Sequence, residues 1–139
     1  MTPPGPARPL ALDVLAGRLA VCRLPPDAPL AGWMWTPGGP AGRPAVAGVV
    51  RTEAELSVVC AARAVPAGVR AERGWRALRV RGPLPFDAVG VLASITAPLA
   101  AAGVSVFSLS TFDTDVVLVR EADLDAARAA LGGAGHAVG

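Results

Sequence analysis

The 139-residue sequence predicts an α+β protein of two small units side by side, each with strands and helices in the order βαββαβ. Residues 103–119 hold two apolar runs around a polar turn, and a helical pattern flanks them on each side. Helix–strand–turn–strand–helix is the later part of a ferredoxin-like unit. The first half repeats the strand order, with its helices reduced to single turns. We therefore expect a degenerate first unit at 10–66 and a complete second unit at 67–139.

Short apolar runs predict the strands of the first unit, because they are rich in Val, Ala and Leu and are bounded by turn residues. Residues 27–35 predict one helical turn, and the Pro- and Gly-rich residues 36–44 predict a loop. Thr52 and Glu55 fit a capping box at the start of a short helical turn. The expected strands are residues 11–15, 18–24, 45–50 and 56–61.

Longer periodic segments predict the second unit. After a connection over 64–74, residues 74–82 alternate apolar and arginine side chains, which indicates a half-buried strand. A helix is expected over 87–102, bent by Pro98. A second helix runs from 121 or 123 to 131, and a short strand follows it. The expected buried faces are Val89, Leu92, Thr96 and Leu99 in the first helix, and Leu124, Ala127 and Leu131 in the second.

Composition argues against nucleic-acid and membrane functions. The net charge is only +2, and the arginines of residues 70–81 are interpreted as a solvated strand face. No apolar run approaches the roughly 18–20 residues that a membrane span needs. The N-terminal segment does not resemble a signal peptide, so a cytoplasmic protein is expected.

Catalytic chemistry is also not indicated. The chain has one histidine, His136, which we expect to be exposed. Cys22 and Cys60 lie in apolar runs and are expected to be free, buried thiols. No nucleophile–base pair, metal-ligand cluster or phosphate-binding loop is apparent. The sequence therefore predicts a protein that is not an enzyme and needs no metal or cofactor.

Several strings resemble one family. They are RTEAELSVVC at 51–60, GWRALRVRGPL at 74–84, residues 90–124 with the specific string STFDTD, and the closing AGHAV. These strings are similar to small bacterial proteins with two ACT domains. They also resemble the cytosolic arginine sensors of animals and, more distantly, the regulatory ACT domains of aspartokinases. The resemblance covers about residues 10–138, and the loop at 36–44 departs from it.

The resemblance implies a βαββαβ fold repeated twice, without catalysis. It implies binding of a free amino acid or related small effector between ACT units, and a homodimer. Two places would contact the ligand. Unsatisfied N–H groups at a helix start bind a carboxylate well, here those of Ala88, Val89, Gly90 and Val91. Asp115 would bind the ammonium, with Asp113 as second choice and Thr111 and Phe112 lining the wall.

Alternatives stay open at this point. From the residues alone, Asp113 and Asp115 fit turn capping, and Gly90 fits helix packing. In the arginine sensors an acidic residue near the matching helix start reads the guanidinium, and Ala88 stands at that position here. A small or apolar amino acid therefore fits better than arginine. The competing hypothesis is a structural or interaction protein that kept the fold and lost the ligand.

Overall fold

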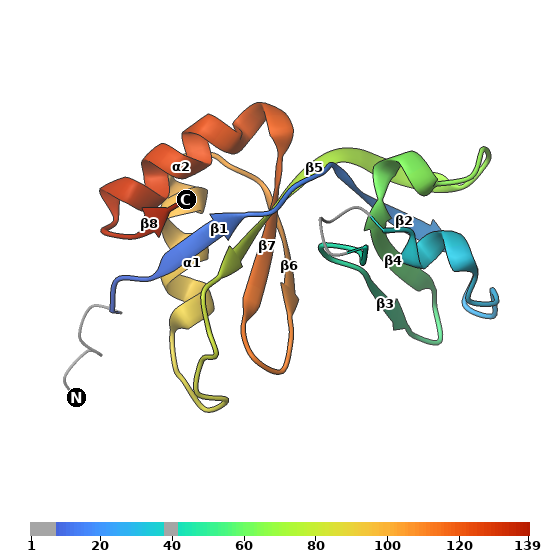
Figure 1. Cartoon of the computed structure of the whole chain (residues 1–139), viewed down its shortest axis with the longest axis horizontal. Coiled ribbons are helices and arrows are strands. Elements are labelled where there is room, and N and C mark those ends of the chain that lie inside the picture. The colour runs from blue at the N-terminus through green and yellow to red at the C-terminus, as the bar shows by residue number, and fades with distance from the viewer. Residues whose placement is uncertain (1–7, 38–41) are drawn as a thin grey trace. The chain divides into compact units, whose positions relative to one another are not determined.

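The structure is a computed structural model that describes residues 8–37 and 42–139 (Figure 1). The middle of the expected loop at 36–44 thus lies outside the described residues. The chain forms two compact units: unit 1 comprises the chain up to Val14 with Leu78–Gly139, and unit 2 comprises Leu15–Ala77. These units differ from the expected units at 10–66 and 67–139, because the first strand pairs with strands of the C-terminal half.

Unit 1 contains the complete ferredoxin-like order, which confirms the predicted fold class. From the end of β5 onward, strands and helices follow one another as βαββαβ, and β1 joins this set from the N-terminal side. The elements are β1 (Ala11–Val14), the end of β5 (Arg70–Val80), α1 (Val91–Ala101), β6 (Val106–Ser110), β7 (Asp115–Arg120), the 3-10 turn η3 (Glu121–Asp123), α2 (Leu124–Gly133) and β8 (Ala137–Val138).

The sheet of unit 1 has the order β6-β7-β5-β1-β8. β1 runs antiparallel to β5 and parallel to β8, with Leu12 opposite Val80 on one side and Val138 on the other. β6 and β7 form an antiparallel hairpin whose last pair before the turn is Ser110 with Asp115. The turn carrying the two aspartates therefore lies at one end of the β6–β7 hairpin.

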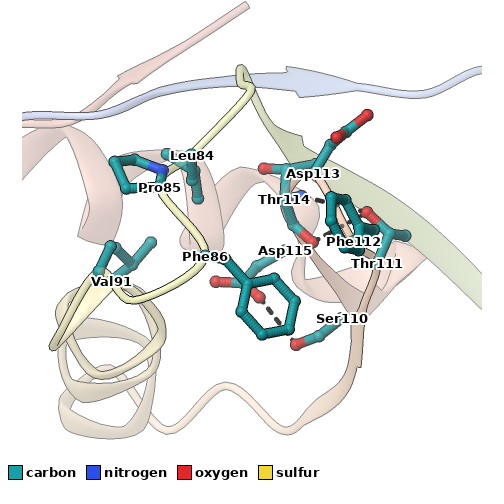
Figure 2. Close-up of a pocket in the computed structure, with 11 residues that line it drawn as sticks. Leu84, Pro85, Phe86, Val91, Ser110, Thr111, Phe112, Asp113, Thr114 and Asp115 are labelled. Atoms are coloured by element: carbon teal, nitrogen blue, oxygen red, sulfur yellow. Dashed lines mark hydrogen bonds between the residues drawn. The ribbon is translucent and has the colours of Figure 1, made fainter.

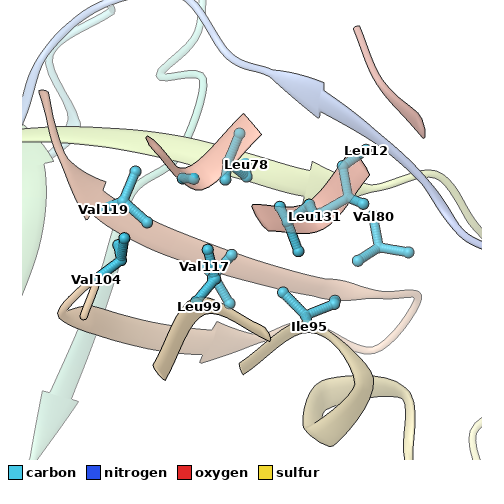
Figure 3. Close-up of a cluster of buried hydrophobic side chains, with 10 residues drawn as sticks. Leu12, Leu78, Val80, Ile95, Leu99, Val104, Val117, Val119 and Leu131 are labelled. Carbon is cyan, nitrogen blue, oxygen red and sulfur yellow. The ribbon is translucent and has the colours of Figure 1, made fainter. Parts of the chain in front are cut away.

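One hydrophobic core lies between this sheet and the two helices (Figure 3). Alternate residues of β1, β5 and β7 supply one side of it, as the period of two in a strand requires. The α1 and α2 helices, which pack against each other, supply the other side. The buried cluster consists of Leu12, Leu78, Val80, Ile95, Leu99, Val104, Val117, Val119, Ala127 and Leu131.

Helix α1 begins four residues later than predicted. Gly90 has a φ of 82°, a left-handed conformation that cannot belong to a right-handed helix, so the helix starts at Val91. Ile95 and Leu99 are its buried residues, whereas Val89 precedes it and is 90% exposed. The predicted stripe was wrong at Val89, and Ile95 holds the central buried position that had been expected for Thr96. Pro98 lies inside the helix as predicted.

Two neighbouring substitutions can test which face of α1 is buried. Ile95→Ala should destabilise the protein by about 2–5 kcal/mol, because it leaves a cavity in a closely packed core. Thr96→Ala removes one methyl group and one hydroxyl, which donates to the Leu92 carbonyl at 3.1 Å, and should cost less than about 1 kcal/mol. Urea unfolding of both variants measures the difference. Equal losses would contradict the observed orientation of α1.

Unit 2 is an antiparallel sheet in the order β3-β4-β2-β5, with 3-10 turns in place of helices. Over its described residues it contains no α-helix, which agrees with the predicted degenerate unit. Its core is the cluster of Ala20, Cys22, Met34, Leu56, Val58 and Cys60. Its elements are β2 (Leu19–Leu24), η1 (Gly32–Trp35), β3 (Gly48–Arg51), β4 (Leu56–Ala61), η2 (Ala62–Ala64) and the first part of β5.

Two details of unit 2 differ from the expectation. The connection after β4 is shorter than predicted, since β5 already begins at Arg70. Thr52 and Glu55 close the β3–β4 hairpin instead of starting a helical turn. Thr52 Oγ1 accepts the N–H groups of Ala54 and Glu55 at 3.1 and 3.2 Å. The capping chemistry is present, but it serves a strand connection.

The two cysteines are free and buried, as predicted. They lie on adjacent strands, and burial raises the pKa of both thiols, that of Cys60 to about 12. His136, in contrast, is only 7% exposed, so its expected exposure was wrong. Within the described residues, no group of three or more metal-ligating side chains is assembled. None of the helices described has the length and apolar character that crossing a membrane requires.

Candidate functional site

A pocket of about 520 Å³ lies in unit 1, between the segment that follows β5 and the turn that joins β6 to β7 (Figure 2). Its volume falls within the roughly 300–1,000 Å³ typical of small-molecule sites. It is lined by Leu84, Pro85, Phe86, Ala88, Val91, Ser110, Thr111, Phe112, Asp113, Thr114 and Asp115.

Hydrogen bonds hold the two walls together. The Leu84 N–H donates to the Asp113 carbonyl at 2.7 Å, and the Thr114 hydroxyl donates to the Val80 carbonyl, also at 2.7 Å. Inside the turn, the Thr111 N–H donates to the Thr114 carbonyl, and the Thr114 N–H donates to Thr111 Oγ1. Threonines therefore stabilise this turn, so neither aspartate side chain is needed to cap it.

At Gly82 the two walls leave no room for a side chain. A Cβ at this residue would lie 3.0 Å from the Leu84 nitrogen and 3.1 Å from the Asp113 oxygen, which are backbone atoms. Gly82→Ala should therefore push the turn away and destabilise the protein by about 1–3 kcal/mol. Gly132→Ala is a control, since a Cβ there meets nothing within 4 Å. Urea unfolding of the two variants distinguishes them. A Gly82→Ala protein as stable as the parent would contradict the close approach.

Asp115 supplies a negative charge to the lining of the pocket. It is half-buried, and its Oδ1 accepts the Ser110 hydroxyl at 2.7 Å across the hairpin. In Figure 2 this carboxylate points toward the space beside α1, whereas the Asp113 carboxylate points to the opposite side. Asp113 is exposed. The bond from Ser110 fixes Asp115 and leaves its second oxygen able to accept a ligand donor.

The start of α1 forms the facing wall. Gly90 has no side chain to cap the helix, and the first intrahelical bond runs from Ser94 N–H to the Gly90 carbonyl. The N–H groups of the first helical turn have no partner within the helix, and they carry the positive end of its dipole. Val91 belongs to this turn and lines the pocket.

The four donors expected at the helix start are thus not all in place. Ala88 lines the pocket, but its N–H donates to the Pro85 carbonyl at 3.0 Å. Val89 is 90% exposed and is not among the lining residues. Gly90 is the helix cap and does not line the pocket either. The later start of α1 shifts the available N–H groups toward Val91.

Two phenylalanines form the rim. The rings of Phe86 and Phe112 lie 5.2 Å apart at 38°, and the side chains are 80% and 81% exposed. Apart from Asp113 and Asp115, the lining residues are uncharged. A negative site with an aromatic rim is suited to a ligand that carries an ammonium and an apolar group.

The pocket brings together six of the eight residues predicted for the site. Leu84, Pro85 and Phe86 were missed because the helix was expected to follow the strand almost directly. Ser110 and Thr114 were missed because the hydrogen bonds that hold them at the site join different segments of the fold. The spacing of Ser110 and Asp115 around a four-residue turn was the signal that makes them cross-strand partners.

Comparisons with known proteins bear on this site. The family model described as "ACT domain" matches residues 70–132, which include the whole pocket. The crystal structure of a protein from Agobacterium tumefaciens is 34% identical, with a TM-score of 0.84 over 95% of this chain and 93% of that one. The ligand-free regulatory subunit of aspartate kinase from Thermus thermophilus is 15% identical, with a TM-score of 0.54 over 90% and 96% of the two chains.

Curated relatives of this chain, from several mammals, are named for a ligand. The human "Cytosolic arginine sensor for mTORC1 subunit 1" is 50% identical over 48 residues. That match covers 34% of this chain and 15% of the sensor subunit. The likeness is therefore to a small part of that protein.

Proposed function

This chain belongs to the ACT-domain family, and from that premise we propose that it is a regulatory module whose unit 1 pocket binds a free amino acid or a similar small effector. One observation carries the proposal. Asp115, fixed by Ser110, lies in the same pocket as Val91 of the uncapped first turn of α1. An anion and a set of N–H donors match the ammonium and the carboxylate of an amino acid.

The binding mode follows from these groups. The ligand ammonium donates to the second oxygen of Asp115, and the ligand carboxylate accepts N–H groups at the start of α1. The ligand side chain lies against the rings of Phe86 and Phe112. Ala88 offers no charge to a guanidinium, so we propose a small or apolar amino acid in preference to arginine.

The module is proposed to act without catalysis. The pocket is lined by no histidine or cysteine, and its Ser110 hydroxyl is committed to Asp115. We assign its effect to ligand-dependent contacts with another protein. The cytosol is the proposed compartment, since the human relative is named a cytosolic sensor.

A second ACT unit, from another copy of the chain, is proposed to cover the pocket. Phe86 and Phe112, whose rings lie 5.2 Å apart at the rim, are at least 80% exposed, and Val89, just ahead of α1, is 90% exposed. Exposed apolar groups clustered in this way are typical of interaction sites. The ligand would then lie at the interface between two ACT units of a homodimer.

A thermal-shift screen of the twenty amino acids tests the proposal. A ligand at 100 times its dissociation constant stabilises the folded state by about 2.7 kcal/mol. We expect at least one small or apolar amino acid to raise the melting temperature of the parent protein and to leave that of an Asp115→Asn variant unchanged. An equal rise in both proteins would place the ligand elsewhere.

The exposed rim also supports the second candidate, an interaction protein without a ligand. On that account no amino acid changes the melting temperature, while Phe86→Ser or Phe112→Ser still weakens self-association in light scattering. A screen with no hit together with a rim-dependent dimer would favour this candidate.

A further inference from the structure

His136 joins three separate segments of unit 1 through its two ring nitrogens. The Leu10 N–H, just before β1, donates to Nδ1 at 3.0 Å. Nε2 lies 3.0 Å from the carbonyl oxygen of Ser94, the fourth residue of α1. The histidine itself directly precedes β8 and is 7% exposed. One buried ring thus connects segments that are 126 and 42 residues away in the sequence.

The partners fix the protonation state of the ring. A backbone N–H can only donate, so Nδ1 accepts and carries no proton. A backbone carbonyl can only accept, so Nε2 carries the proton and donates. Both bonds therefore form only with the neutral ring in its Nε2–H form.

Pro98 explains why the Ser94 carbonyl is available to His136. In an α-helix the carbonyl of residue 94 accepts the N–H of residue 98. Proline has no N–H, so the Ser94 carbonyl loses its intrahelical donor. A buried carbonyl without a donor is costly. The imidazole of His136 supplies the donor that the proline removes.

We propose that His136 is a proton-controlled latch that holds the start of β1 and the N-terminal part of α1 against the β8 end of unit 1. A second proton on Nδ1 would face the Leu10 N–H, donor against donor, and that bond would break. Leu10 also accepts the Ala137 N–H at 2.9 Å, in the β1–β8 pairing. Releasing the Leu10 N–H therefore weakens the end of this strand pair.

The surroundings offer the protonated ring little compensation. Helix α1 contains no ionisable side chain. On β1, Asp13 accepts three hydrogen-bond contacts from Arg81, at 2.7 to 3.0 Å. The ionisable side chains of α2, Asp125 and Arg128, are exposed, as is Arg8 ahead of β1. Among the described residues, the ring nitrogens hydrogen-bond only to Leu10 and Ser94.

The first arm of the test follows the Leu10 amide by hydrogen exchange on the full chain at pH 7.5 and pH 5.5. In water an imidazole passes from mostly neutral to mostly charged between these values. We expect the protection factor of Leu10 to fall at least tenfold at the lower pH. His136→Asn places an amide oxygen near the position of Nδ1 and does not titrate, so its Leu10 protection should be the same at both values. If the Asn variant does not fold, His136→Gln takes its place: it lacks the titrating ring, so Leu10 protection should not change with pH.

The second arm tests the link to Pro98 by urea unfolding of a double-mutant cycle. His136→Asn leaves the Ser94 carbonyl without its donor and should lower the folding equilibrium constant at least fivefold. Pro98→Ala restores an intrahelical N–H, so the same substitution in the Pro98→Ala background should lower it less than twofold. If the Asn variant does not fold alone, its recovery in the Pro98→Ala background supports the link. Leu10 protection independent of pH in the parent protein, or strictly additive substitutions, would overturn the latch.

Discussion

Replacing Asp115 by alanine is expected to abolish effector binding while the protein stays folded. The ammonium of the ligand would lose its anion inside a partly dehydrated pocket, and truncating one partner of such a pair costs about 2–5 kcal/mol of affinity. That loss is enough to erase a micromolar complex. Asp115 is half-buried and its hydrogen-bond partner Ser110 is exposed, so water can take over the lost bond. Titration calorimetry with the best amino acid from the screen measures the change.

Asp113→Ala is the matched control for this substitution. Its carboxylate points away from Asp115 in Figure 2, and threonines stabilise the turn, so both affinity and stability should change little. Calorimetry showing equal affinity for the parent protein and the Asp115→Ala variant would contradict the site. An unfolded Asp115→Ala protein would instead assign a structural role to Asp115.

The second large effect is a loss of folding stability at alkaline pH, which we expect because the buried thiols resist ionisation in the folded state. Burial raises the pKa of Cys60 from an ordinary value near 9 to about 12 in the folded protein. The folded state therefore keeps a proton that the unfolded chain releases. The folding stability is therefore unaffected by this thiol below pH about 9, and it falls as the pH rises toward 12. The loss amounts to several kcal/mol, at about 1.4 kcal/mol for each unit of pKa difference.

The composition makes this measurement unusually clean. The chain contains no lysine and no tyrosine, and arginine keeps its proton throughout this range. Urea unfolding at pH 8 and pH 10.5 should thus report the cysteines. A Cys22→Ala/Cys60→Ala protein should lose far less stability between these values than the parent. If both proteins lose stability equally, the thiols are not responsible.

Sequence patterns were sufficient for the β6–β7 hairpin and the α2 helix of unit 1. The helix pattern of residues 124–131 and the two apolar runs around STFDTD are local signals, and each element formed where it was predicted. The position of β1 was not predictable in this way. Its pairing with β5 and β8 joins residues more than 60 apart, and no local pattern encodes such a partner.

The misses at the site have local physical causes. Gly90 was interpreted as a helical residue, yet its left-handed φ delays the helix, and the segment ahead of it lines the pocket with Leu84, Pro85, Phe86 and Ala88. His136 was expected at the surface because polar residues near a chain end are mostly exposed. Its two backbone partners, which make burial favourable, are distant in sequence and could not be seen.

The central claim is that an amino acid binds between Asp115 and the first turn of α1. Chemical-shift mapping by NMR, during titration with the best amino acid from the screen, tests it most directly. We expect the largest amide shifts on residues 91–93 and 110–115, and we expect these shifts to disappear in Asp115→Asn. Saturating shifts confined to unit 2, with residues 91–93 and 110–115 unmoved, would contradict it.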